Sequence, residues 1–223
     1  MSIDPKKAVD IQKELQSKVQ LKPLDKKPTF IAGADASVEK FGTDLYAGII
    51  VLSFPDLKPV CHALSKIEIT FPYVPGLLSF REIPGLLECF NKLPVKPHLI
   101  IVDGQGIAHP RRLGIASHLG LVTGIPTIGC AKTRLFGAFR APTIPGESSE
   151  IKDSYTGDFL GYAYKSNKRS NPLIISPGHL IDQMGALEIV KASIKNYKLP
   201  EPTRLAHELV NKFRRGEVSE NPK

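Results

Sequence analysis

Leu99-Ile100-Ile101-Val102-Asp103-Gly104 is an unbroken run of branched aliphatic residues that ends on a carboxylate. Four such residues without polar alternation predict a strand that is buried on both faces of a sheet. Ligands of open α/β sheets bind at the carboxyl ends of the strands, and Asp103 would emerge there. Asp103 is therefore the first candidate for chemistry, although a turn or N-cap Asp before Gly104 would look the same in the sequence.

The composition is that of an ordinary globular protein with surplus positive charge. The 223 residues are 42% hydrophobic and 23% charged, and the formal net charge of +8 favours a polyanionic partner such as nucleic acid. Three cysteines without CxxC spacing indicate reduced thiols and argue against zinc or a disulfide framework. No signal peptide precedes the first helix and no apolar run approaches the roughly 20 residues of a membrane span, so we expect a cytoplasmic protein.

The first part of the chain predicts a helix followed by an antiparallel meander. Asp4-Pro5 supplies an N-cap and a first helical residue, and the helix that follows is expected to cover the sheet. A polar link then leads to three strands with short connections, which favour a meander. These strands are expected at residues 30–38, 45–54 and about 60–71.

The middle of the chain predicts a βαβ unit. Pro84 is expected to open a helix ahead of the strand that ends at Asp103. A second helix ends at Gly124, and an apolar strand over 126–131 then ends at Lys132. Strand, helix and strand over this distance predict two parallel strands, so Lys132 would emerge at the same edge as Asp103.

The last third of the chain predicts shorter elements. Residues 137–154 are rich in Pro, Gly, Ser and Thr and indicate an irregular connection. Two short strands and two helices follow, with a proline-containing break between the helices. They are expected at 158–165, 173–176, from Asp182 to about 197, and at 204–215, with the break at 200–203. We expect one domain over residues 1–223, with a loose tail at about 216–223.

Three meander strands followed by helix, strand, helix and strand is the order of the ribonuclease H-like fold, an α/β fold with a mixed central sheet. Its first and fourth strands lie side by side, so Asp35 and Asp103 would converge, with Glu82 just before the intervening helix. Carboxylates without an arginine partner repel one another unless a hard cation lies between them, and oxygen ligands select Mg²⁺ or Mn²⁺. Taken singly, each acid could instead be a bulge, helix-start or loop-cap residue.

Several segments carry motifs whose combination is highly specific. They are FPYVPG at 71–76 with SFRE at 79–82, VDG at 102–104 with HPRRLGIASH at 109–118, GCAK at 129–132, SPGH at 176–179 and LPEPTR at 199–204. Through these motifs the chain, from about residue 10 to residue 210, resembles the endonuclease V family of repair enzymes for deaminated bases.

The resemblance implies a DNA repair endonuclease that hydrolyses the second phosphodiester bond on the 3′ side of deoxyinosine by metal-activated water attack. The products would carry a 3′-hydroxyl and a 5′-phosphate, and the lesion would stay in place. The resemblance further implies that Asp35, Glu82, Asp103 and His207 bind Mg²⁺, for which Mn²⁺ can substitute. Lys132 would neutralise the scissile phosphate.

The resemblance also implies how the lesion is held. A tyrosine between two prolines sits on a stiff loop, because each ring fixes φ and restricts the residue before it. The implied wedge, which would replace the extruded hypoxanthine in the helix, consists of Pro72, Tyr73, Val74 and Pro75. The implied pocket for the nucleotide is lined by Gly76, Gly104 and Gly106, with His109 nearby. His179, after a Pro-Gly turn, is expected to be a structural group or a group that supports the metal ligands from behind.

Arginines flank these motifs and fit a nucleic-acid groove as a cluster, although each alone could be an ordinary solvated side chain. They are Arg81, Arg111, Arg112, Arg134 and Arg140. Two residues depart from the family pattern, because Gln105 stands where many relatives carry histidine and His207 where others carry aspartate. By spacing alone, His207 would be a solvated histidine that lies off the apolar face of the helix predicted at 204–215.

Two other functions remain open. The same site could cleave inosine-containing RNA, because metal-assisted hydrolysis does not depend on the sugar unless a 2′-hydroxyl is required. A protein that binds deaminated bases without cutting is disfavoured, since Asp35, Glu82 and Asp103 are all present. The expected partner is DNA containing deoxyinosine, with inosine RNA as the alternative, and the expected state is a monomer that does not engage membranes.

Overall fold

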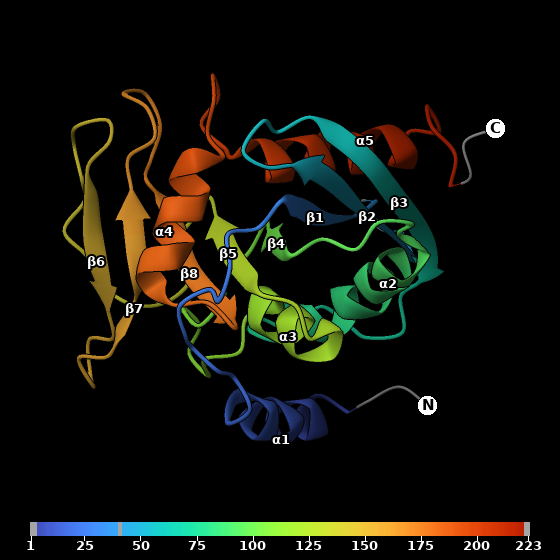
Figure 1. Ribbon diagram of the computed structural model, residues 1–223. Coiled ribbons are helices and arrows are strands. Elements are labelled where there is room, and N and C mark those ends of the chain that lie inside the picture. Colours follow the sequence, from blue (N-terminus) through green and yellow to red (C-terminus); the bar gives the residue numbers. More distant parts are fainter. Residues whose placement is uncertain (1–3, 40–41, 221–223) are drawn as a thin grey trace.

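The computed structural model describes residues 4–39 and 42–220, and its elements are arranged around one eight-stranded sheet (Figure 1). The strands are β1 (Phe30–Val38), β2 (Asp44–Ser53), β3 (Pro59–Glu68), β4 (Leu99–Val102), β5 (Thr127–Ala131), β6 (Ser148–Lys152), β7 (Phe159–Tyr164) and β8 (Leu173–His179). The helices are α1 (Pro5–Gln16), α2 (Leu78–Lys92), α3 (Ile115–Thr123), α4 (Gln183–Ala192) and α5 (Glu201–Arg214). None of these helices is long and apolar enough to cross a membrane.

The sheet has the order β3-β2-β1-β4-β5-β8-β7-β6 and is mixed. The first three strands form the expected antiparallel meander, and β4 lies parallel to both β1 and β5. The predicted ribonuclease H-like fold is therefore confirmed. Ala34 pairs with Val102 in the parallel register. The residues that follow them in the chain, Asp35 and Asp103, are both predicted metal ligands.

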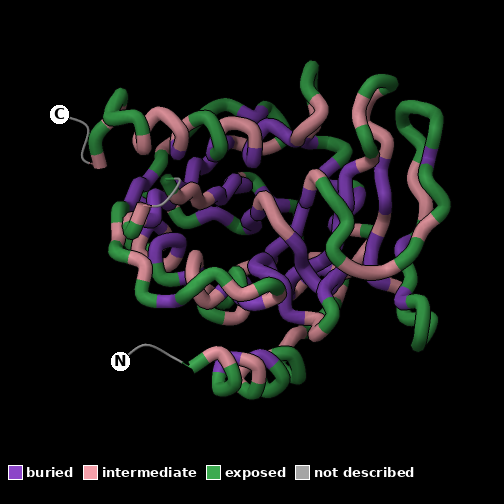
Figure 2. Tube along the Cα trace, turned by 180° about the vertical axis from the view of Figure 1, so that it is seen from behind, coloured by how far each residue is buried: buried purple, intermediate pink, exposed green. Residues whose placement is uncertain are grey.

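Two hydrophobic clusters lie on opposite faces of the sheet. On β4, Ile101 packs with α4 and α5, whereas Ile100 packs with α2 and α3. All four residues of β4 are buried, so the strand is covered on both faces as its sequence predicts. Figure 2 shows that buried positions gather in the central strands, while the outer helices alternate between buried and exposed positions.

The start of α2 differs from the sequence expectation. The helix begins at Leu78, so Pro84 lies inside it and Glu82 is a helical residue instead of one that precedes the helix. An internal proline removes one backbone hydrogen bond and disfavours helix in the residue before it. Burial of Ile83 and Leu86 on the same helix offsets that cost by packing α2 onto the sheet.

Three other expectations are corrected. Residues 137–154 contain β6, whose sequence signal is weak because Ile151 is its one fully buried residue. Residues 200–203 form the cap and first turn of α5, where a proline costs no hydrogen bond. Helix α1 lies outside α3 and does not cover the sheet directly (Figure 1).

Glu220, near the C-terminus, lies beside β3 and α2. Glu220 accepts a hydrogen bond from the backbone N–H of Lys66 and pairs with Lys92. Part of the segment expected to form a loose tail is therefore in contact with the sheet. Residues 221–223 of that segment lie outside the described residues.

Candidate metal centre and adjoining cavity

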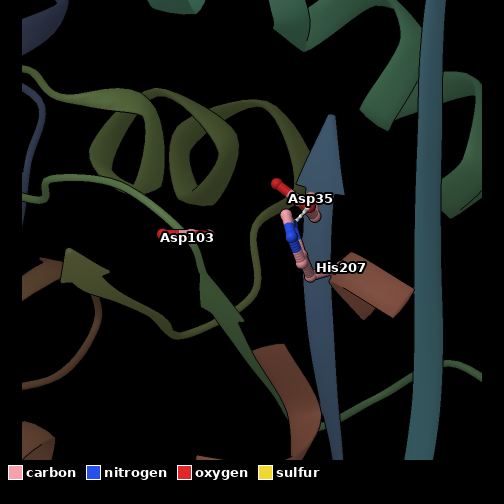
Figure 3. Close-up of side chains that lie close together, drawn as sticks. All are labelled: Asp35, Asp103 and His207. Carbon is pink, nitrogen blue, oxygen red and sulfur yellow. Dashed lines mark hydrogen bonds and ion pairs between the residues drawn. The ribbon is translucent and has the colours of Figure 1, made fainter. Parts of the chain in front are cut away.

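Asp35, Asp103 and His207 bring their side chains together at the carboxyl edge of the sheet (Figure 3). One potential ligand atom of each lies within 4.8 Å of the others. Asp35 comes from β1, where that strand runs past the end of β4, and Asp103 follows β4 directly. The backbone N–H of Asp103 donates to the carbonyl of Ala34 at 3.2 Å, which fixes the two strand ends side by side.

Helix α5 reaches this edge because small residues on the sheet let it approach closely. A Cβ atom on Gly33 would overlap the carbonyl of Pro202, and one on Gly48 would lie 2.7 Å from Val210 Cγ2. Gly33 on β1 and Gly48 on β2 thus let α5 pack closely on the sheet. That packing places His207 Nδ1 2.8 Å from Asp35 Oδ2.

A neighbour on the same helix contacts the other side of the imidazole. Asn211 Nδ2 lies 3.1 Å from His207 Nε2 and also donates to the His207 carbonyl at 2.9 Å. The imidazole is therefore held between a carboxylate and an amide. The i, i+4 spacing of these two residues is a signal that the sequence contained and that its analysis missed.

The acids of this edge disfavour one another's charge. Burial raises the pKa of Asp35, the charge of Asp103 raises it further, and contact with His207 partly offsets both effects. Burial, the charge of Asp35 and then that of Asp103 raise the pKa of Glu82 to about 8, although Arg81 opposes the shift. Glu82 thus shares the electrostatic environment of the cluster without belonging to the group of three.

This donor set fits a divalent cation. Two carboxylates and an imidazole are ligands that such ions accept. A cation among the acids would offset the mutual repulsion that, after burial, raises their pKa values. Lys132, at the end of β5, pairs with Asp103 and supplies one positive charge at the same edge. Its place confirms that β4 and β5 deliver both side chains to one edge.

A cavity of about 350 Å³ adjoins the cluster on the side of α2 and α3. Tyr73, with 68% of its surface exposed, lies on its wall together with Val74 and Pro75. Gly76, Gly104 and His109, three of the four residues predicted to bind the base, also line it. Lys132 lines the cavity as well, so the cavity opens beside the metal centre.

Gly106 is the fourth residue, and it lies elsewhere. A Cβ atom there would overlap the carbonyl of Pro177, and its backbone N–H donates to Ser176 Oγ at 2.9 Å. Gly106 therefore joins the loop after β4 to β8 instead of lining the cavity. His179 is buried, and its Nδ1 accepts from the backbone N–H of Gln20 at 3.2 Å.

The loop that carries Tyr73 is anchored at Gly76. The Gly76 carbonyl accepts hydrogen bonds from Gln12 at 3.0 Å, Arg111 at 2.8 Å and His109 at 3.1 Å. Burial, and then the charge of Arg111, lower the pKa of His109 to about 4, so its ring is neutral at pH 7. Gln12 was not singled out from the sequence, although it follows buried Ala8 at helical spacing.

The predicted phosphate-binding arginines have different surroundings. Arg111 contacts Gln12 and the loop of Tyr73, so it braces the cavity wall. Arg112 pairs with Asp153 and Asp158, and these contacts join the loop after β4 to the turn between β6 and β7. Arg81 Nε is buried without a hydrogen-bond partner among the described residues. The structure thus gives Arg112 two carboxylate partners and leaves its predicted phosphate contact untested.

The sheet order and the acidic edge cluster define a ribonuclease H-like protein with a candidate divalent-metal centre. The Endonuclease V family model matches residues 13–208. The chain belongs to the endonuclease V family and is accordingly a nuclease.

Relatives and solved structures agree over nearly the whole chain. Endonuclease V of Xanthomonas axonopodis pv. citri is 43% identical over 213 residues, which are 95% of this chain and 89% of the relative. The crystal structure of endonuclease V from Streptomyces avermitilis superposes with a TM-score of 0.89 at 34% identity, covering 97% of this chain and 95% of that one. Ciona intestinalis endonuclease V gives a TM-score of 0.86 at 26% identity, covering 97% and 100%; it was crystallised with a 23mer DNA containing an inosine followed by a ribo-adenosine.

Proposed function

We propose that this nuclease cleaves DNA that contains deoxyinosine, at the second phosphodiester bond on the 3′ side of the lesion. The observation that carries the proposal is the adjacency of the Asp35–Asp103–His207 cluster and the cavity beside Tyr73, with Lys132 in contact with both. The Ciona relative, crystallised with inosine-containing DNA, supports the same substrate class. The cut would leave a 3′-hydroxyl, a 5′-phosphate and the lesion in the strand.

Asp35, Glu82, Asp103 and His207 would hold the metal, with Mg²⁺ preferred because most of the donors are carboxylate oxygens. When bound, such an ion lowers the pKa of a water molecule and stabilises negative charge on a phosphodiester. Glu82 would be stabilised in its ionised form by such an ion, since burial and then the charge of Asp35 raise its pKa to about 8. Mn²⁺ would substitute for Mg²⁺ at the same oxygens.

The other residues would hold and orient the strand. The Lys132 ammonium, already beside Asp103, would neutralise the scissile phosphate. Tyr73 is the exposed aromatic group of the cavity wall and would stack where the hypoxanthine leaves the helix, a contact worth roughly 1–3 kcal/mol. The base would enter the cavity of about 350 Å³, which falls within the usual size range of small-ligand sites.

A ribonuclease acting on inosine RNA is the second candidate, favoured by one observation. The DNA bound to the Ciona relative carries a ribo-adenosine next to the inosine. A 2′-hydroxyl beside the lesion is therefore compatible with binding in that protein. The chemistry proposed for Asp35 and Asp103 would serve either sugar.

The test is to incubate the protein with matched inosine DNA and inosine RNA strands, each with and without Mg²⁺, and to map the ends. We expect a Mg²⁺-dependent cut in DNA directly after the nucleotide that follows inosine, and no cut in a control strand that carries adenine in place of inosine. Preferential cleavage of the RNA would replace the first proposal with the second. Binding to inosine strands without any cut would contradict both.

A further inference from the structure

A second cavity, of about 290 Å³, lies on the other side of Lys132. Its wall is formed by Lys132, the end of the connection between α4 and α5, and the first turns of α5. The residues that line it are Lys132, Tyr197, Lys198, Leu199 and Arg204. The first cavity contacts the starts of α2 and α3, whereas this one lies on the face of the sheet covered by α5.

Lys132 belongs to both cavities, so a strand that places a phosphate at Lys132 has a hollow on either side of it. Under the proposed function, the lesion occupies the first cavity and the scissile phosphate lies at Lys132. The nucleotide that follows the cut bond must then continue beyond Lys132, and the second cavity is the hollow that adjoins it there.

Tyr197 gives the second cavity a fixed aromatic surface. Tyr197 is 56% exposed, and the Arg204 guanidinium carbon lies 4.5 Å from the centroid of its ring. Arg204 is in turn held by Glu201, whose backbone N–H donates to the Ser193 carbonyl at 2.8 Å. Because Arg204 covers one face of the ring, the exposed area is available for a base to stack on.

Lys198 gives the same cavity an unpaired cation. Among the described residues, 4–39 and 42–220, the Lys198 ammonium has no hydrogen-bond or ion-pair partner. Lys198 lines the same cavity as Lys132, so one strand could contact both lysines. By contrast, Arg204 is neutralised by Glu201 and Glu208 and is placed to support Tyr197.

We propose that Tyr197 and Lys198 form a subsite for the nucleotide on the 3′ side of the cut bond. Tyr197 stacks on the base of that nucleotide, and Lys198 pairs with its 3′ phosphate. Stacking on an aromatic ring accepts any base, so the subsite binds the strand without reading its sequence. This inference rests on the proposed function, because the path of the strand follows from the position of the cut.

The test compares three inosine strands that differ beyond the cut. One is intact, one has an abasic site at the nucleotide after the cut bond, and one ends at that nucleotide with a 3′-hydroxyl. We expect Tyr197→Ala to raise KM about tenfold on the intact strand and to have no further effect on the abasic one. Lys198→Ala is expected to raise KM severalfold, with a shallower salt dependence, and to have no effect on the truncated strand.

Matched controls separate the subsite from general effects. Lys195→Ala removes a lysine of the same connection whose ammonium bonds to the Asp56 carbonyl, and Tyr155→Ala removes a tyrosine that is 93% exposed at the β6–β7 turn. Tyr197→Phe should keep the wild-type KM, since it retains the ring. Equal losses for Tyr197→Ala on intact and abasic strands would overturn the inference, as would losses no larger than those of the controls. If the wild-type protein cuts no inosine strand, the proposed function itself fails.

Discussion

The metal centre and the cavity beside it are built from different kinds of structure. The centre takes its side chains from β1, from the residue after β4, and from α5, which packs directly on the sheet at Gly33. The cavity wall is largely loop, held by hydrogen bonds to one carbonyl, that of Gly76. The groups proposed for chemistry therefore stand on packed elements, and the groups proposed for recognition stand on an anchored loop.

This difference indicates how the two regions should respond to substitution. A change at the centre removes a charge or ligand but leaves the sheet and helix packing in place, so catalysis should fail without loss of fold. A change in the anchored loop shifts backbone as well as side chain, so binding and stability should fall together. The predictions that follow test this contrast.

The largest effect is expected at the centre. Asp35→Asn and Asp103→Asn should each reduce Mg²⁺-dependent cleavage by more than about a hundredfold, because a charged ligand is lost from the proposed ion. Binding of inosine strands with Ca²⁺ in place of Mg²⁺ should stay within a few fold of wild type. Cleavage by gel assay and binding by fluorescence anisotropy measure the two quantities.

Stability supplies the control for this prediction. The pKa of Asp35 is raised in the folded protein, so its ionised form destabilises the fold above that pKa. Asp35→Asn should therefore unfold at the same or a higher temperature in EDTA at pH 7. A lower Tm would show that the carboxylate stabilises the fold, and wild-type cleavage in either variant would contradict the ligand assignment.

The sequence predicted the centre better than the cavity, for a physical reason. The unbroken apolar run before Asp103 and the strand–helix–strand spacing predicted the parallel pair of β4 and β5, which brings Asp103 and Lys132 to one edge. The element order of the ribonuclease H-like fold predicted that β1 and β4, and with them Asp35 and Asp103, lie side by side. His207 needed the family resemblance, because its approach depends on Gly33 and Pro202, which are far apart in the chain.

Contacts between distant loops carry little local signal. The bond from Gln12 to the Gly76 carbonyl spans 64 positions, and no periodicity connects them. Gly106 was predicted to line the cavity because it resembles the glycines around it, but its neighbour is Pro177 on β8. Pro84 was predicted to begin α2 because proline disfavours the interior of a helix. The helix instead begins at Leu78, because tertiary packing of its buried face decides its length.

The next largest effect is expected at Asn211, which contacts the imidazole of His207 in the metal centre. Asn211→Leu removes the amide that contacts His207 Nε2, and partners of this kind typically change metal affinity or activity by about 10- to 100-fold. We expect half-maximal cleavage to require about tenfold more Mg²⁺, with the same rate at saturation. Lys212→Leu, at the next position of α5, is the matched control and should leave the Mg²⁺ titration unchanged.

A comparable or smaller effect is expected for the exposed ring of the cavity. Tyr73→Ala should weaken binding to an inosine duplex about tenfold and binding to the undamaged duplex much less, since stacking replaces a base only where one has left the helix. Tyr155→Ala removes an exposed tyrosine at the β6–β7 turn and should change neither affinity. Equal weakening of both duplexes by Tyr73→Ala would refute the wedge role.

The smallest effect is expected at Gly76, whose carbonyl anchors the loop of Tyr73. A second glycine at positive φ, Gly157, shows what backbone strain does without that anchor. Gly76 has φ +78°, and a Cβ atom there would lie 2.7 Å from Arg111 Nη2, whereas Gly157 has φ +76° and open space around it. Both Gly76→Ala and Gly157→Ala should lower the free energy of unfolding by about 1 kcal/mol, because alanine is strained at positive φ. Only Gly76→Ala displaces Arg111 from the carbonyl that holds the loop, so only this variant should also weaken inosine binding, by a few fold. Equal binding in the two variants would mean that Gly76 is constrained by its φ angle and that the cavity does not depend on the anchor.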